Sequence, residues 1–155
     1  MVRKAAKPLS LIGWRELVDL PELGLHAVPA KIDSGARTSS LHGRVIEEFE
    51  RDGEKFVRFE VFFSAQKVSQ VCEAVHVDKR SITSSNGETQ VRYVVKTPLQ
   101  IGEETFRAEI SLADRGSMKF PMLVGRSALR RRFAVDSGHS WLQTPDRDVV
   151  EGHKP

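Results

Sequence analysis

An aspartate flanked by a hydroxyl residue and a glycine ends an alternating apolar stretch near residue 30. Val28, Ala30 and Ile32 alternate with other residues, and Asp33-Ser34-Gly35-Ala36 follows directly. Alternation with a period of two predicts a strand that delivers Asp33 at its end. A carboxylate held there by backbone is one way of presenting a catalytic acid. Asp-Ser-Gly after a strand is also common in Asx-type turns, and the stretch taken alone favours that turn.

A second junction with a glycine lies near the other end of the chain. The apolar run Met122-Leu123-Val124 stops at Gly125-Arg126 and leads into a segment with helical spacing of apolar residues. Gly125 would permit the turn between strand and helix, as it would in any such junction. The order along the chain is therefore a strand with Asp-Ser-Gly-Ala, several hairpins, an apolar-Gly-Arg strand end and one late helix.

The segments between these junctions predict a mostly-β protein. The predicted strands are 9–18, 25–32, 41–49, 55–63, 71–77, 89–97, 105–112, 134–136 and 139–142, and the predicted helix is 126–133. Asp52-Gly53 and Asn86-Gly87 are hairpin turn signals, the second with an exposed tip. Many short strands spaced about ten residues apart, with one short helix near the C-terminus, predict a closed barrel.

Composition indicates a single globular domain. The chain has 155 residues, of which 39% are hydrophobic and 29% charged, and its formal charge is +3. We expect a domain over 10–144, a flexible basic tail over 1–9 and a flexible tail over 145–155. The single cysteine, Cys72, excludes an intramolecular disulfide and favours a half-buried packing role in a reducing compartment. Because no membrane-length apolar run or secretion signal is found, we expect a cytoplasmic protein without a membrane partner.

Motifs for other chemistries are missing from the sequence. The five histidines are scattered and none stands at metal-ligand spacing, so we predict no metal site. The sequence has no phosphate-binding G-x-x-x-x-G-K-[ST] loop and no G-x-S-x-G elbow. We therefore predict no cofactor.

The two junctions, in this order, resemble the retropepsin family of aspartic peptidases. In detail the chain is similar to the bacterial retropepsin-like family often labelled "ATP-dependent zinc protease". The matching residues are Ile12-Gly13-Trp14-Arg15, Lys31 to Ser39, Asp114-Arg115 and Phe120 to Arg126. The similarity covers roughly 11–143 and implies a closed retropepsin-like (acid protease) barrel. The zinc and ATP of the label find no ligand set in the sequence, so neither is expected.

The resemblance also implies a mechanism. Retropepsins are homodimers in which each subunit places one aspartate, here Asp33, at the two-fold axis. Two carboxylates in contact share one proton, so one activates water while the other polarises the scissile carbonyl. By similarity Ser34 braces the two loops across the interface and Gly35 lets the backbones approach. The hairpin tipped by Asn86-Gly87 would be the flap that closes over the substrate.

A second Asp-Ser-Gly occurs at Asp136-Ser137-Gly138. Pepsin-type chains carry two such motifs, but no second apolar-apolar-Gly element has room to follow this one. We therefore interpret it as a turn between the helix and a terminal strand.

The residues around Asp33 differ from the viral pattern. By similarity the substrate pocket includes Lys31, Ala36, Arg37, Lys119, Pro121 and Leu123, and Gly125 and Arg126 have structural roles at the dimer. Lys31 shares a strand face with Asp33 at a position that is usually apolar. Arg37 replaces the acid that pairs with the Gly-Arg arginine in viral enzymes, so Arg126 needs another acid, such as Asp114.

The added positive charge suggests an acidic substrate. We hypothesise a glutamate-rich peptide or protein tail, including one made by an ATP-grasp glutamate ligase, because relatives of this family occur beside or fused to such ligases. Alternatively, Lys31 and Arg37 only pair with local acids such as Glu16 or Glu22.

Two other functions remain open. A non-catalytic dimer could bind acidic tails without cutting them. A basic barrel could bind nucleic acid through Arg130-Arg131-Arg132, but aromatic residues make up 7% of the chain and none interleaves with this run. Nucleic acid is the least favoured partner.

Overall fold

The computed structural model describes residues 8–63, 68–83, 87–113 and 119–144. Ten strands, one 3-10 turn and one helix occur in this part of the chain. In chain order they are β1 (Ser10–Gly13), β2 (Arg15–Leu20), η1 (Pro21–Leu23), β3 (Leu25–Asp33), β4 (Ser39–Arg51), β5 (Glu54–Phe63), β6 (Val68–Thr83), β7 (Thr89–Ile101), β8 (Glu104–Ala113), β9 (Met122–Gly125), α1 (Arg126–Leu129) and β10 (Phe133–Asp136). The predicted mostly-β class with one short helix near the C-terminus is confirmed.

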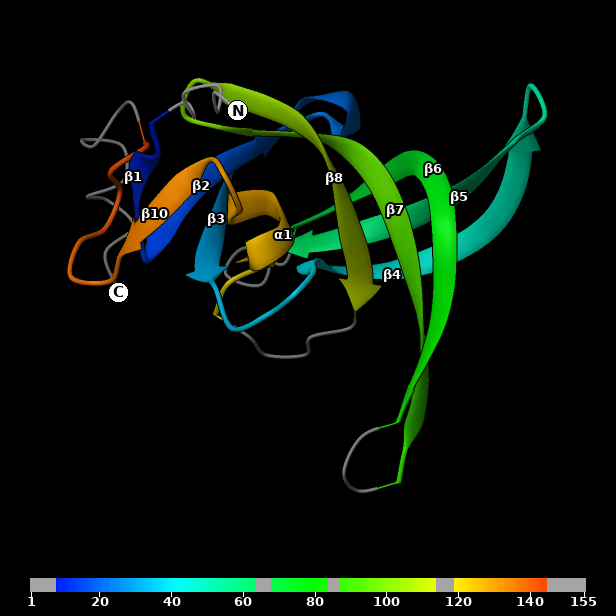
Figure 1. The fold of residues 1–155 in the computed structure, drawn as a ribbon. Helices are drawn as coiled ribbons and strands as arrows, with labels where there is room; N and C mark the ends of the chain where they lie inside the picture. The colour runs from blue at the N-terminus through cyan, green and yellow to red at the C-terminus, as the bar shows by residue number, and fades with distance from the viewer. Residues whose placement is uncertain (1–7, 64–67, 84–86, 114–118, 145–155) are drawn as a thin grey trace, which may run out of the picture.

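The strands form two sheets (Figure 1). Eight strands follow the order β2-β3-β9-β4-β5-β6-β7-β8, and further pairings of β2 with β7 and of β4 with β8 bring this sheet back on itself. β1 and β10 form a separate two-stranded parallel sheet. The prediction of a closed barrel is therefore confirmed only in part, because the sheet closes through the pairings β2–β7 and β4–β8 and does not form one regular ring.

The core forms on one face of each alternating strand. On β3 the side chains of Val28, Ala30 and Ile32 are buried, as the period-two pattern predicts. Phe59 of β5 is fully buried in the same cluster. Cys72 is buried as well, more deeply than expected, and this burial raises the pKa of its thiol to about 11. The thiol therefore stays protonated at neutral pH and packs as an apolar group.

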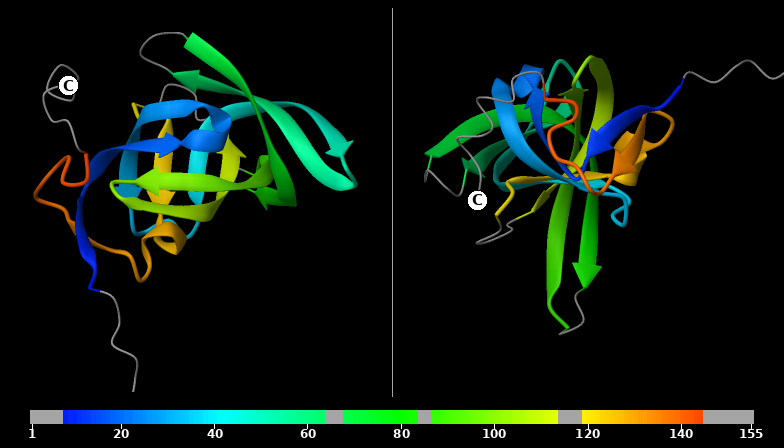
Figure 2. Two further views of the ribbon diagram at one scale, coloured as in Figure 1. Left: turned by 90° about the horizontal axis from the view of Figure 1, so that it is seen from above. Right: turned by 90° about the vertical axis from the view of Figure 1, so that its left-hand side faces the viewer.

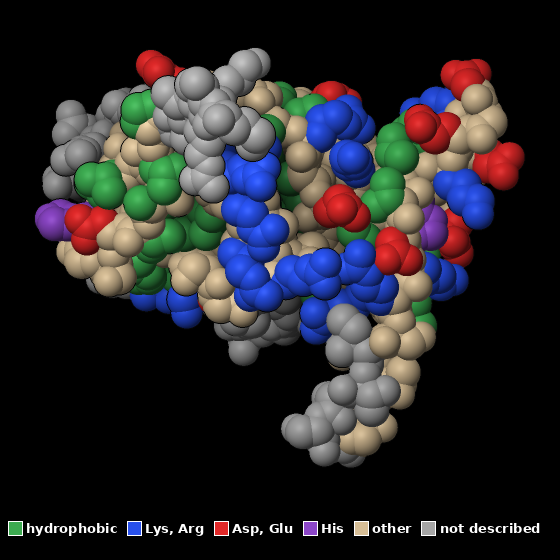
Figure 3. Space-filling model, viewed as in Figure 1, with side chains coloured by type: hydrophobic (Ala, Val, Ile, Leu, Met, Phe, Trp, Pro, Cys, Tyr) green, Lys and Arg blue, Asp and Glu red, His purple; other side chains and the backbone are tan. Residues whose placement is uncertain are grey.

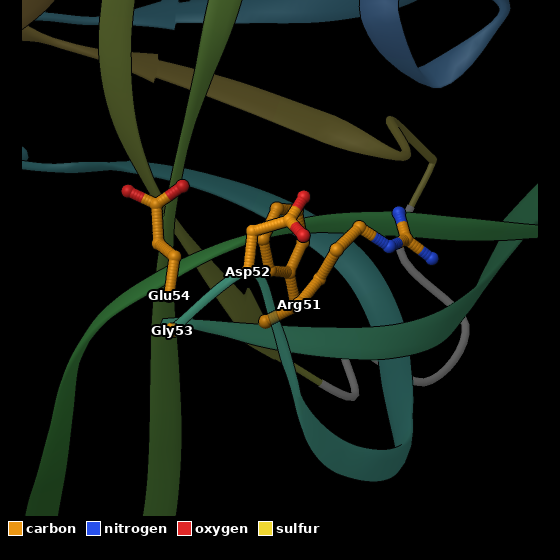
Figure 4. Close-up of a pocket in the computed structure, with 5 residues that line it drawn as sticks. Arg51, Asp52, Gly53 and Glu54 are labelled. Carbon is orange, nitrogen blue, oxygen red and sulfur yellow. The ribbon is translucent and has the colours of Figure 1, made fainter.

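Two long hairpins project from the body of the molecule in different directions (Figure 1, Figure 2). The β4–β5 hairpin turns at Asp52 and Gly53, both with positive φ, so the Asp-Gly turn is confirmed. Its tip carries a shallow hollow of about 420 Å³ lined by Arg51, Asp52, Gly53, Glu54 and Phe56 (Figure 4). β6 and β7 form the second hairpin, in which Gly87 is exposed and Asn86 lies outside the described residues.

One predicted strand is divided in two, the predicted helix is too long, and another predicted strand is absent. The strand over 9–18 is broken at Trp14, where the chain leaves the β1–β10 sheet and joins β3. The helix predicted over 126–133 ends at Leu129, because Arg131 has a φ of 67° and Phe133 already belongs to β10. The strand predicted over 139–142 is absent, and Trp141 there has a φ of 63°.

Candidate active site

Asp33 is the last residue of β3, and its position is fixed from two sides. β3 pairs in parallel with β9, so that Asp33 lies opposite Gly125. The Gly35 N–H donates to Asp33 Oδ1 at 3.0 Å, and the Ala36 N–H donates to the Asp33 carbonyl at 3.2 Å. This is the Asx-type turn that the sequence favours, and it also holds the carboxylate by backbone. The turn and the presented acid are therefore the same structure.

The Asp33 loop and the β9–α1 junction cross in direct contact. A Cβ at Gly125 would lie 2.7 Å from the Thr38 carbonyl carbon and 2.9 Å from the Ala36 oxygen. The Gly125 N–H donates to Ser39 Oγ at 3.0 Å, and Ser39 is fully buried. Only glycine fits here, because backbone meets backbone. Ser39 is a positioning residue that the sequence did not single out.

The start of α1 closes the loop from the other side. The Arg126 N–H donates to the Ala36 carbonyl at 2.8 Å, and the Ser127 N–H donates to the Arg37 carbonyl at 3.1 Å. The Arg126 guanidinium donates through Nη1 to the Gly35 carbonyl at 3.1 Å. Among the described residues, the partner of this guanidinium is thus a carbonyl oxygen, and its pairing with an acid such as Asp114 stays a prediction. Asp114 lies outside the described residues.

The substrate-pocket residues predicted from the resemblance differ in exposure. Lys31, Arg37 and Lys119 are exposed, as are Ser34 and Gly35, whereas Ala36 and Leu123 are half-buried and Pro121 is buried. On β3 the inward positions are Ala30 and Ile32, so Lys31 and Asp33 share the outward face. Cross-strand neighbours of Lys31 are Arg15 on β2 and Leu123 on β9.

Glu16 has a different role from the one considered in the sequence. It is fully buried on β2, at an inward position shared with Val18 and Leu20. Its carboxylate accepts hydrogen bonds from the backbone N–H groups of Gly13, Leu142 and Gln143 and from Thr144 Oγ1, at 2.7 to 3.0 Å. A buried carboxylate needs such donors, and these four tie residues 142–144 to β1 and β2.

The alternative pairing of Lys31 or Arg37 with Glu16 is therefore not supported. Glu16 is surrounded by its own donors, and no ion pair of Lys31 or Arg37 is found within the described ranges. Glu16 could have been noticed in the sequence, because a carboxylate at an inward strand position requires an explanation.

Arg15, the cross-strand neighbour of Lys31, contacts both Trp14 and residues 140–141. Its guanidinium lies between the rings of Trp14 and Trp141, 4.7 and 4.8 Å from their centroids, and Nε donates to Ser140 Oγ at 3.1 Å. A Cβ at Gly13 would lie only 2.7 Å from the His139 carbonyl oxygen. Residues 139–141 thus pack directly against Ile12-Gly13-Trp14-Arg15.

The second Asp-Ser-Gly forms the turn that we predicted. Asp136 ends β10 opposite Gly13, and the Gly138 N–H donates to Asp136 Oδ1 at 3.0 Å. The pKa of the Asp136 carboxyl is lowered first by this N–H and then by His139, whose Nδ1 lies 2.8 Å from Oδ2. The strand expected after the turn is absent, and the residue at that place, His139, is the partner of the Asp136 carboxylate.

Two general features of the described residues bear on other kinds of site. They contain no group of three or more His, Cys, Asp or Glu side chains that could hold a metal ion. No helix in this part of the chain is long and apolar enough to cross a membrane.

The fold and the crossing of the Asp33 loop with Gly125 define a retropepsin-like protein. The RimB-like family, described as retropepsin-like aspartic endopeptidase RimB, matches residues 11–146, and the chain belongs to this family. A solved structure of a protein of unknown function from Legionella pneumophila is also similar, with a TM-score of 0.71 and 27% identity over 85% of this chain and 96% of that one.

Curated relatives extend well beyond this domain. A probable alpha-L-glutamate ligase of Shewanella halifaxensis is 40% identical over 90% of this chain, and one of Shewanella pealeana is 41% identical over 84%. These matches cover only 31% and 29% of the two relatives, so the chain spans about a third of their length.

Gly125→Ala should destabilise the protein by about 1–3 kcal/mol, because the added methyl group would meet backbone that cannot move away. Urea unfolding at unchanged m-value measures this loss. Gly138→Ala is the matched control. It makes the same change in the turn at Asp136, where the nearest atom to the added Cβ is Asp136 Oδ1 at 3.4 Å. Equal unfolding midpoints of the two variants would contradict the close crossing at Gly125.

Proposed function

We propose that the protein is an aspartic-type peptidase that acts as a homodimer on acidic, glutamate-rich peptides or protein tails. The observation that carries this proposal is the position of Asp33. Its half-buried carboxylate stands at a strand end on the outward face, held by the Gly35 N–H and backed by Gly125. Each subunit would contribute one such carboxylate.

The chemistry follows from bringing two Asp33 side chains together. Two carboxylates in contact cannot both ionise at low cost, so the pair keeps one shared proton. The ionised member takes a proton from a water molecule as that water attacks the scissile carbonyl carbon. The protonated member donates to the carbonyl oxygen, which gives a gem-diol. The first carboxyl then passes its proton to the amine as the C–N bond breaks, and the second takes back a hydroxyl proton as the new carboxylic acid forms. Ser34 and Gly35, both exposed, would brace the two loops against each other.

A second copy has a suitable surface on the β1–β10 sheet. Leu9, Leu11 and Val135 are exposed there by 52%, 58% and 38%. The chain passes from β1 to β2 through Trp14, whose carbonyl accepts from the Ile32 N–H at 2.8 Å, so the β1–β10 sheet joins β3 next to Asp33. Burying these side chains against a partner subunit would stabilise a dimer that pairs the two Asp33 loops.

The β6–β7 hairpin is the proposed flap. Its base is tied to β4, since the Tyr93 hydroxyl donates to Glu48 Oε2 at 3.3 Å and Lys79 Nζ lies 3.6 Å from the same oxygen. Beyond these contacts the hairpin projects from the body of the molecule (Figure 2). A fixed base and a projecting tip suit an element that closes over an extended peptide.

The acidic substrate is supported by charge and by the relatives. Lys31, Arg37 and Lys119 are exposed cations. Lys31 shares the outward face of β3 with Asp33, and Arg37 lies in the loop that follows Asp33. The curated relatives are named probable alpha-L-glutamate ligases. A ligase that adds glutamate makes a chain of carboxylates joined by peptide bonds, which suits a peptidase with exposed cations beside its catalytic acid.

Asp33→Asn should reduce hydrolysis of a glutamate-rich peptide by at least about a hundredfold, because the shared-proton pair can no longer activate water. Peptide binding should persist, since the change is nearly isosteric. Asp136→Asn serves as the control and should retain activity. If the wild type binds the peptide but hydrolyses it no faster than Asp33→Asn does, the protein is a binding module and not a peptidase.

Oligoglutamate should be cleaved faster than neutral apolar peptides of the same length. Lys31→Gln with Arg37→Gln should lower kcat/KM for oligoglutamate about tenfold, and should flatten its dependence on salt because exposed charges are screened. Steady-state kinetics at two ionic strengths measure both effects. Preference for the neutral peptides would contradict the acidic substrate while leaving the Asp33 chemistry intact.

A further inference from the structure

A concentrated positive charge lies outside the Asp33 loop, at the turn after α1. Arg130, Arg131 and Arg132 follow one another there, and with Ser127 they line an open hollow of about 460 Å³. No carboxylate lines this hollow, and no ion pair of these three arginines is found in the part of the chain that the structure describes. Like charges on consecutive residues repel, and an anion in the hollow would relieve that repulsion.

The backbone of this turn is well defined. The Arg130 N–H donates to the Arg126 carbonyl at 2.8 Å and caps α1. Arg131 has a φ of 67°, which is unusual for a residue with a side chain. The Arg132 guanidinium lies 3.9 Å from the Phe106 ring centroid and donates to the Ala128 carbonyl at 3.3 Å. These contacts fix the backbone of the turn and the side chain of Arg132, which reduces the entropic cost of binding an anion there.

The hollow is connected to the Asp33 loop by a single helical turn. Arg126 and Ser127, at the start of α1, bond the carbonyls of Gly35 and Arg37. Four helical residues span on the order of 6 Å, and an extended peptide covers roughly 3.3 Å per residue. A substrate at Asp33 would therefore reach the hollow within about two to four residues. Figure 3 shows Lys and Arg side chains gathered in a band over α1 that continues towards β8 and β7.

We propose that Ser127, Arg130, Arg131 and Arg132 form an exosite, a second binding site that holds carboxylate side chains of the substrate more than two residues from the scissile bond. This inference rests on the proposed acidic substrate and adds a separate anchoring site for it. Guanidinium groups bind carboxylates in forked geometry. Nucleic acid fits the hollow less well, because no aromatic residue lines it and the ring of Phe106 is covered by Arg132.

The test is the binding of decaglutamate and of tetraglutamate to protein carrying Asp33→Asn, which prevents turnover. A tetraglutamate bound across the active site reaches at most two residues to either side of the scissile bond. Adding Arg130→Gln and Arg131→Gln should weaken decaglutamate binding about three- to tenfold and change tetraglutamate binding less than twofold. Arg132 is left unchanged because it packs on Phe106.

Arg51→Gln with Lys55→Gln is the matched control, because it removes the same charge from the tip of the β4–β5 hairpin, which lies away from α1 (Figure 1). This control should leave decaglutamate binding unchanged. Equal losses for the two double variants, or equal losses for long and short peptides, would overturn the exosite. Tighter binding of a single-stranded RNA than of decaglutamate, lost in the same arginine variant, would assign the hollow to nucleic acid instead.

If decaglutamate binding depends on Arg130 and Arg131 but the wild type hydrolyses no peptide, the proposed peptidase function fails and the exosite stands. If the wild type cleaves oligoglutamate with no contribution from these arginines, the peptidase stands and the exosite fails. Thermal unfolding of each variant verifies that the substitutions leave the fold intact.

Discussion

The contact between Gly125 and the backbone after Asp33 determines much of the site. β3 and β9 run parallel, so Asp33 and Gly125 lie opposite each other at their ends. The absence of a side chain at Gly125 lets residues 36–38 pass close over it, and the next residue, Arg126, then bonds the carbonyls of Gly35 and Ala36. The Asp33 carboxylate is held in place as a result, because its loop is bonded at the carbonyls of Gly35, Ala36 and Arg37. A precise acid position is what an intersubunit pair of carboxylates requires.

A similar crossing occurs a second time, at the ends of the described chain. β1 and β10 are parallel, Gly13 lies opposite Asp136, and residues 139–141 pass close over Gly13. Here the carboxylate is bonded to His139, and the neighbouring Glu16 ties residues 142–144 down. The same local arrangement thus occurs twice with different roles. At Gly125 it positions Asp33 on the outward face, and at Gly13 it anchors the last described segment against Ile12-Gly13-Trp14-Arg15.

Much of the fold was accessible from the sequence because it depends on local pattern. Alternation placed Ile32 inward and Lys31 outward, and Asp-Gly placed the β4–β5 turn. The order of the two glycine junctions pointed to the family that the chain belongs to. The failures arose where distant contacts decide: the helix ends early because Phe133 pairs with Ser10, and residues 139–142 form no strand because their backbone binds Glu16 and Arg15. The bond from Arg126 to the Gly35 carbonyl could not be predicted either, because a backbone carbonyl partner has no signature in the sequence.

The account depends on two copies of Asp33 meeting, and the separation of the two carboxylates in a crystal structure of the protein with an uncleavable glutamate peptide tests this most directly. We expect a symmetric dimer in which carboxylate oxygens of the two Asp33 residues lie within hydrogen-bonding distance, on the order of 2.5–3 Å, with the peptide across them. A monomer with bound peptide, or a dimer that keeps the two side chains apart, would leave water activation without its acid partner and would contradict the proposal.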